Sequence, residues 1–396
     1  YFCNTTAGAF TVNLPAGVAG AIVSLADYAA TWQTNNVTVT PNGTDKIGSI
    51  NGNTILATEG QSVTFVFVDS TQGWINTMDS TSNARGAAFI CASVSGACNT
   101  LVTVDTDYKV ATFTGPGTFT INSGGGSLAK VDYLVVAGGG GAGSVIAGGG
   151  GAGGFRESHC ATTSGPYTAS PLASITSLGP FSPGGIPITV GGGGAGSTPP
   201  GPTGDGVKGS DSIFSTITST GGGFSQDAAP SASPALGQPG GSGGGGGRRS
   251  RAAGNGNTPP VSPPQGNPGG AGGGPGYAAD GEGSAGGGGG AGAAGTTGTG
   301  APGGPNDGGA GGAGVTSSIN GTPTARAGGG GGGVYAPGTA GTGGTGGGGA
   351  GGPGTAPAVA GTANTGGGGG GAGYPTGTDD GAAGGSGIVI IRYKFQ

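Results

Sequence analysis

Residues 131–141 read VDYLVVAGGGG, and residues 384–394 read GGSGIVIIRYK. Each contains a run of β-branched and aromatic residues, which is typical of a strand. Glycine runs recur between these two segments, with irregular spacing that is often near twenty residues, which suits one short extended segment and one loop per unit. The main runs are Gly138–Gly141, Gly148–Gly151, Gly191–Gly194, Gly221–Gly223, Gly243–Gly247, Gly286–Gly290, Gly328–Gly333, Gly346–Gly349 and Gly366–Gly371.

Glycine runs are ordinarily flexible, because glycine loses the most backbone freedom on folding and brings no side chain to bury. Here the runs alternate with varied sequence and lie between two strand-like segments, as in a closed domain. A polyproline II helix has about three residues per turn and no internal hydrogen bonds. Its N–H and C=O groups must therefore bond to neighbouring helices. Helices with neighbours on several sides need glycine at nearly every position, so the runs predict a sandwich of polyproline II helices. A strict Gly-X-Y period is absent, which argues against collagen.

The chain before this segment is predicted to contain strands and no helix. Residues 1–79 are predicted to form a β-sandwich-like module, since short apolar or alternating runs are separated by turn signals such as Asn-Gly. Trp32 and Trp74 supply large apolar area for a core or for the seam of an oligomer. The expected strands are Phe10–Leu14, Ala21–Leu25, Val37–Thr40 and Val63–Val68.

Residues 80–128 are predicted to be a short lead-in of two β-hairpins, and residues 129–396 the glycine-rich domain. Its first and last strands are expected to pair, because both ends must be tied for the domain to close. Two further strand-like runs, Ile186–Val190 and Ile213–Ile217, are expected to extend the sheet that these strands form. The hairpins are expected to join 87–94 with 101–104 and 108–113 with 117–121. The predicted fold class is thus all-β modules followed by a polyproline II sandwich, with essentially no α-helix.

Charge and composition exclude several classes of protein. Charged residues make up 7% of the chain and the formal net charge is -5. Nucleic acid binding, which needs a basic patch, is therefore not expected. No apolar run approaches the roughly 20 residues that span a bilayer, and no signal peptide is visible. Because the sequence begins at Tyr1 in a strand-like run, we interpret it as part of a longer or processed protein.

The sequence predicts no catalytic or metal centre. Cys3, Cys91, Cys98 and Cys160 form no CxxC motif, and we expect free thiols, although Cys91 and Cys98 could close a small loop. Glu157, His159 and Cys160 resemble a nucleophile with its base, but a loop that happens to contain them is the preferred interpretation. Asp105 and Asp107 could bind a cation, but a solvated strand edge is preferred. We expect no enzyme activity and no cofactor.

Binding residues are expected in the connections between glycine runs. Tyrosine and phenylalanine at loop tips bury large area at low entropic cost, and clustered arginines can contact an anionic sugar or phosphate. The alternatives are that the aromatic rings cap the glycine core, as we expect of Tyr133, Tyr393 and Phe395, and that the arginines only solubilise a loop. If successive helices alternate in direction, the loops should be divided between two ends. The candidate receptor-binding residues are Arg248, Arg249, Arg251, Tyr277, Tyr335, Tyr374 and Phe224.

The glycine-rich part resembles the tip adhesins of bacteriophage tail fibres, whose core is a sandwich of polyproline II helices. The resemblance lies in VDYLVVAGGGG at 131–141, GGGGAGGFR at 148–156, the later runs and GGSGIVIIRY at 384–393. Residues 108–121 resemble the β lead-in of such proteins, and residues 1–76 resemble a tail-fibre β repeat.

This resemblance implies a tail-fibre protein of the virion, extracellular after release, that recognises a host cell-surface receptor, either a protein or a glycan. The implied partners are that receptor and other tail-fibre or virion proteins, with a possible homotrimer. A structural fibre or virion-decoration protein is the alternative, and an ice-binding polyproline II bundle is a third. The sequence does not identify the receptor or the host.

Overall fold

The computed structural model describes residues 1–80, 89–124, 128–197, 204–226, 236–274, 283–300, 306–375 and 380–395. The chain divides into two compact units, Tyr1–Gly86 and Ala87–Gln396. In the described residues both units are built from strands and extended segments, and the helix α1 (Ala161–Ser164) has only four residues. The predicted all-β class is therefore confirmed.

The first unit packs two sheets face to face. One sheet has the order β1-β3-β6-β7 and the other β2-β4-β5. Alternate residues of β6 are buried, as expected for a strand with one face against a core. The strands are β1 (Phe2–Cys3), β2 (Phe10–Asn13), β3 (Ile22–Asp27), β4 (Val37–Thr40), β5 (Thr54–Leu56), β6 (Ser62–Phe67) and β7 (Trp74–Ser80).

Both tryptophans lie in the core of this unit. Trp32 and Trp74 are completely buried among residues of the two sheets, and the Trp74 ring meets Phe67 edge to face at 5.5 Å between centroids. The suggestion that they form the seam of an oligomer is therefore wrong. Because the sequence contains two tryptophans, tryptophan fluorescence reports the unfolding of this unit alone.

Asp27 at the end of β3 holds the loops of the first unit together. Its carboxylate accepts hydrogen bonds from the backbone amides of Thr31 and Trp32, both at 3.2 Å, and of Gly60 at 3.0 Å. Burial by itself raises the pKa of this group, but the backbone hydrogen bonds outweigh burial and lower it. The charged form of Asp27 therefore stabilises the unit.

We expect Asp27→Asn to lower the stability of the first unit by about 1–3 kcal/mol at neutral pH, because one amide loses a strong acceptor. A depressed carboxyl pKa contributes stability above the unfolded value near 3.8, and this is lost as pH falls through the folded value. Acid titration followed by tryptophan fluorescence should thus show a steeper loss in the parent than in the variant. Identical acid profiles and identical melting temperatures would contradict this role.

The strands of the second unit form two main sheets around a shared core. A six-stranded sheet has the order β14-β13-β12-β22-β10-β9, and a five-stranded sheet has the order β17-β16-β15-β11-β8. Phe119, Phe214 and Tyr393 pack edge to face between them. The strands of these two sheets are β8 (Cys91–Ser95), β9 (Thr100–Val104), β10 (Tyr108–Phe113), β11 (Gly117–Ser123), β12 (Asp132–Val136), β13 (Phe155–Ser158), β14 (Ala173–Ser174), β15 (Gly184–Thr189), β16 (Ser212–Phe214), β17 (Ile217–Ser219) and β22 (Ile388–Lys394).

The expected pairing of the first and last strands of the glycine-rich domain is confirmed, since β12 and β22 are antiparallel neighbours. The hairpin predictions are wrong: β8 pairs with β11, and β9 pairs with β10, which continues onto β22. The extension by 186–190 and 213–217 is also wrong, because β15 and β16 join the other sheet. Local strand propensity identified the segments, but not their partners, which depend on packing far along the chain.

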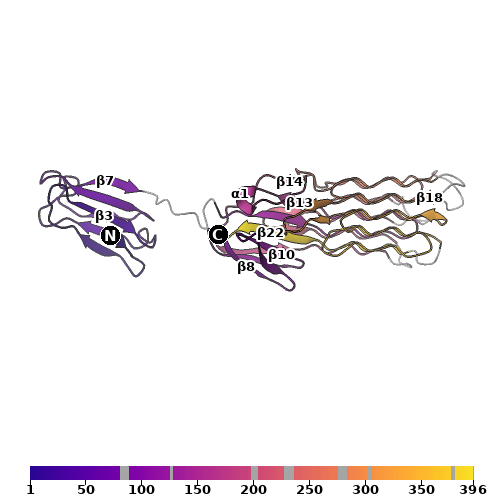
Figure 1. Ribbon diagram of the computed structural model, residues 1–396, viewed down its shortest axis with the longest axis horizontal. Helices are drawn as coiled ribbons and strands as arrows, with labels where there is room; N and C mark the ends of the chain where they lie inside the picture. The colour runs from indigo at the N-terminus through magenta and orange to yellow at the C-terminus, as the bar shows by residue number, and fades with distance from the viewer. Residues whose placement is uncertain are drawn as a thin grey trace. The chain divides into compact units, whose positions relative to one another are not determined.

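The glycine runs form a stack of extended segments that leaves the strands and returns to them (Figure 1). The contacts within the stack repeat every three residues. Gly328 and Gly331 face 341–344, Gly329 and Gly332 face 285–288, and Gly330 and Gly333 face 369–372. This is the period of a polyproline II helix. The amides of the same run donate to three further segments, 346–349, 309–312 and 147–150, so this helix has six neighbours.

Hydrogen bonds follow the same threefold pattern. The amides of Gly328 and Gly331 donate to the carbonyl groups of Gly346 and Gly349, at 3.1 and 2.9 Å. The amide of Gly330 donates to a third segment, at Gly150, over 2.9 Å. The backbone groups that the helix leaves unpaired thus bond to surrounding segments, as predicted.

Candidate functional site

The connections of the glycine stack converge at the end away from the sheets. The turn Gly143–Ala147 follows the first glycine run and lies at the centre of this end. The amide of Ser144 donates to Gly204 O at 2.8 Å, and the amide of Arg248 donates to Ile146 O at 3.3 Å. Ala147 exchanges backbone hydrogen bonds with two later segments, through Ala372 and Gly333. Four connections that are distant in sequence therefore meet at one turn.

The candidate binding residues continue this surface. An added Cβ on Gly283 would lie 3.2 Å from the Cβ of Arg248. The amide of Tyr335 donates to Gly283 O at 3.2 Å, and the amide of Ala336 donates to Tyr374 O at 2.9 Å. We call the residues 143–147, 248–250, 335–336 and 374 the tip surface. The expectation that these loops are divided between two ends is wrong. Returning segments such as 338–344, which runs antiparallel to Gly328–Gly333, separate the runs that lead to these loops.

Two tyrosines form the aromatic part of the tip surface. Tyr335 and Tyr374 are bridged in parallel through their backbones, and their ring centroids are 5.6 Å apart with 32° between the planes. Tyr374 is 37% exposed and Tyr335 is half-buried. The two rings therefore lie side by side and remain partly accessible to solvent.

The three candidate arginines differ in exposure. Arg248 is buried, Arg249 is half-buried and Arg251 is exposed. The Nε atom of Arg249 is buried without a hydrogen-bond partner in the described residues. Phe224 is half-buried beside Ser225, whose hydroxyl accepts from the amide of Gly143 at 2.9 Å. Tyr277 falls outside the described residues.

The turn at the centre of the tip surface has strained backbone. Val145 and Ile146 have φ of 55° and 52°, in the left-handed region that β-branched residues rarely occupy. Such conformations cost on the order of 1–3 kcal/mol each and concentrate at functional sites. The Ile146 side chain is fully buried. Hydrogen bonds from the neighbouring segments therefore stabilise the strained conformation of this turn.

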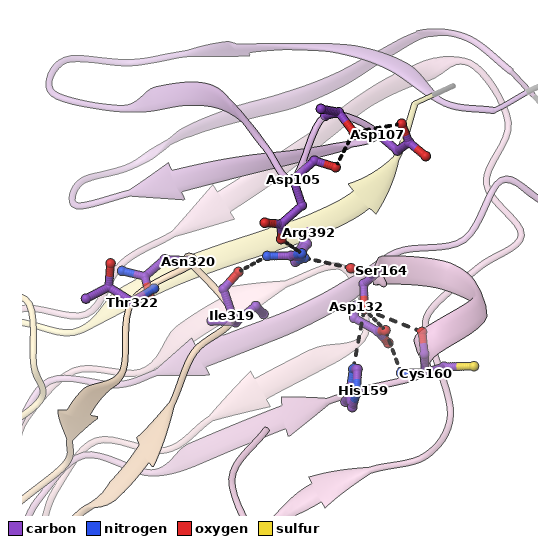
Figure 2. A network of polar contacts seen from close by, with 11 residues as sticks. Asp105, Asp107, Asp132, His159, Cys160, Ser164, Ile319, Asn320, Thr322 and Arg392 are labelled. Atoms are coloured by element: carbon purple, nitrogen blue, oxygen red, sulfur yellow. Dashed lines mark hydrogen bonds and ion pairs between the residues drawn. The ribbon is translucent and has the colours of Figure 1, made fainter. Parts of the chain in front are cut away.

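The opposite end of the unit contains a buried polar network that the sequence analysis did not identify (Figure 2). The Arg392 side chain is completely buried and lies near the rings of Tyr108 and Tyr167, with centroids 5.2 and 5.0 Å from Cζ. It donates to Ser164 O and to the Asp105 carboxylate, each at 2.6 Å, and to Ile319 O at 3.3 Å. Asp105, which follows the edge strand β9 and is 61% exposed, therefore forms an ion pair with Arg392 as well as being solvated.

Asp132 is the acidic counterpart of Arg392 in this network, directly opposite it in the β12–β22 register. Its buried carboxylate accepts from the hydroxyl groups of Ser158 and Ser164, at 2.8 and 2.6 Å, and from the Cys160 amide at 2.7 Å. These bonds fix α1 onto the sheet. The sequence feature that could have identified Arg392 and Asp132 is that each is an ionisable residue inside an otherwise apolar strand.

The residues that resembled a nucleophile and its base face different partners. Glu157 lies in the strand β13 rather than in a loop, and its buried carboxylate accepts from the Ser170 amide and the Ser317 hydroxyl. Burial raises the pKa of this carboxyl. His159 stacks on Tyr167 at 4.2 Å, whereas the Cys160 thiol contacts the Thr162 hydroxyl at 3.1 Å. The hydrogen bonds of Glu157 thus attach the segments that contain Ser170 and Ser317 to the sheet.

The described part of the chain also shows the state of the cysteines and the positions of the remaining aromatic residues, and it bears on metal sites and membrane-spanning helices. All four cysteines are free, and only Cys3 is buried. Tyr133 and Tyr393 lie in the hydrophobic core between the two sheets, and Phe395 packs against it, so the expectation that these rings cap the glycine core is wrong. Among the described residues, no group of three or more His, Cys, Asp or Glu could hold a metal ion. No helix there is long and apolar enough to cross a membrane.

The fold and the tip surface define a class of protein in which a stack of glycine-rich polyproline II helices supports the loops at one of its ends. The family described as a glycine-rich domain matches residues 111–394, and the chain belongs to this family. The match begins in β10 and ends with the last residue of β22, which are paired strands, so it covers the stack together with the strands that close it. No curated protein matches the chain.

Proposed function

We propose that the chain is the receptor-binding protein of a phage tail fibre, an adhesin that contacts a host surface receptor through the tip surface. The observation that carries this proposal is the convergence of distant loops, with their tyrosines and arginines, at one end of a glycine stack. A scaffold held by backbone hydrogen bonds tolerates changes in loops that contribute little to it. Such a division is usual in recognition proteins.

The chemistry of the tip surface supports binding of a receptor. Tyrosine and arginine are the residues most enriched among those that dominate binding energy, and the tip surface presents both. The chain otherwise has few charges and a net charge of -5, so a general electrostatic attraction to anionic cell surfaces is not available to it. Recognition must then depend on shape and on the local groups at the tip.

Removal of the two rings tests this proposal. We expect Tyr335→Ala and Tyr374→Ala each to weaken adsorption of the labelled chain to susceptible bacteria by roughly thirtyfold, the effect of a loss of about 2 kcal/mol at a hot spot. Thermal stability should change little, because both rings remain partly accessible. Adsorption to a panel of bacterial strains, measured beside calorimetry, gives both quantities.

Tyr28→Ala is the matched control, since Tyr28 is 67% exposed in the first unit and adsorption should be unchanged. Variants that adsorb normally would contradict a receptor site at these rings. A chain that adsorbs to no strain, and that microscopy locates along a fibre shaft, would favour the structural alternative. Early melting of both tyrosine variants would indicate that the rings only cover the stack.

A further inference from the structure

A pocket of about 280 Å³ lies at the end of the second unit opposite the tip surface. It is bordered by the residues that precede β12, the end of β22, the helix α1 and the segment after β14. The residues that line it include Lys130, Lys394, Cys160, Thr162, Thr176 and Ser177.

The two lysines both line this pocket and form no ion pair among the described residues. Lys130 precedes β12 by two residues, and Lys394 follows Arg392 by two in β22. Residues two apart in a strand share a face, so Lys394 lies on the Arg392 face of β22. Lys394 lies over the Phe89 ring at 4.9 Å.

Neither of the nearby carboxylates forms an ion pair with these lysines. The carboxylate of Asp132 accepts hydrogen bonds from two hydroxyl groups and one amide, and that of Asp105 is paired with Arg392. Like charges near one another are destabilising unless an opposite charge joins them. A cationic pocket lined by hydroxyl groups, in a chain of net charge -5, is therefore suited to an anion.

We infer that this pocket binds a small multivalent oxyanion, either phosphate or a di- or tricarboxylate, between Lys130 and Lys394. The ammonium groups supply charge-assisted hydrogen bonds. The hydroxyl groups of Thr162, Thr176 and Ser177 are donors for the remaining oxygens. The site is independent of the tip surface and does not rest on receptor binding.

Cys160 provides a reporter inside the pocket. Its hydrogen bond with Thr162 lowers the pKa of the thiol, so a neutral alkylating reagent such as iodoacetamide should modify it readily. We expect phosphate or citrate at millimolar concentration, at constant ionic strength, to slow alkylation of Cys160. The exposed Cys91 and Cys98 are controls within the same molecule, and mass spectrometry of tryptic peptides resolves each thiol.

Substitution of the lysines separates specific binding from screening. Lys130→Gln and Lys394→Gln should each raise the anion concentration needed for protection by about tenfold, as expected for loss of one charged hydrogen-bond partner. Lys208→Gln, at an exposed position of the same unit, should leave it unchanged. Equal protection by chloride at the same ionic strength, or undiminished protection in both lysine variants, would overturn the inference.

Discussion

Replacing Gly330 with alanine is expected to unfold the glycine-rich unit at temperatures at which the parent is stable. A Cβ on Gly330 would lie 2.0 Å from the carbonyl oxygen of Gly369 and 2.6 Å from its carbonyl carbon. Backbone atoms cannot rotate away as side chains can. The neighbouring helix must move, and the hydrogen bonds that join Gly330 to Gly150 and Gly288, each 2.8–2.9 Å, would be lost with it. The expected loss exceeds about 4 kcal/mol, in the range that marks core disruption.

Calorimetry and tryptophan fluorescence together measure this effect in the intact chain. The calorimetric transition of the second unit should shift strongly, whereas the tryptophan signal should not, because Trp32 and Trp74 lie in the first unit. Gly192→Ala is the matched control: it lies in another run of the same stack, and a Cβ there would meet no atom within 4 Å. A small shift for Gly330→Ala, or equal shifts for both variants, would contradict the packing described for the stack.

Replacing Arg392 with methionine is expected to be the second most damaging change, with a loss of about 3–5 kcal/mol of stability in the second unit. Methionine keeps part of the apolar volume but leaves the carbonyl oxygens of Ser164 and Ile319 without their donor. Buried acceptors that lose a partner retain the cost of their desolvation. The rings of Tyr108 and Tyr167 also lose the cation that lies near them.

Asp105→Asn is the control for the ion pair itself. Asp105 is 61% exposed, and the guanidinium group keeps its two carbonyl acceptors in this variant, so we expect a loss below about 1 kcal/mol. Calorimetry of the two variants compares the effects directly. If Asp105→Asn were as damaging as Arg392→Met, the ion pair rather than the burial of the guanidinium group would hold the network together.

Sequence reasoning identified the helix type of the stack because the requirement is local and chemical. A helix with three residues per turn and neighbours on all sides leaves no room for a side chain, so runs such as Gly328–Gly333 specify that environment. The strands β2, β3, β4 and β6 of the first unit and the closing strands β12 and β22 were recognised for a similar reason, whereas β1, β5 and β7 were not. β-branched and apolar residues in short runs favour extended, half-buried backbone wherever that backbone pairs.

The position of the candidate site could be predicted only in part. The sequence indicated Tyr335 and Tyr374 as loop residues, because each follows a glycine run. It could not indicate that their rings lie 5.6 Å apart, nor that Arg248 is buried near them. Some returning segments, such as 338–344, contain no long glycine run, so they were counted as loops, and the loops were assigned to alternating ends.

The sequence alone determined that short apolar runs form strands and that the long glycine runs are helices of a stack, since these follow from local composition and period. The tertiary structure alone decided the partners: β8 with β11, Gly330 with Gly150 and Gly288, and buried Arg392 with Ser164 and Asp105. Glycine has no side chain to distinguish one neighbour from another. The register of the stack is therefore imposed by the strands that close it and the lengths of its turns, and that register brings the loops to one tip.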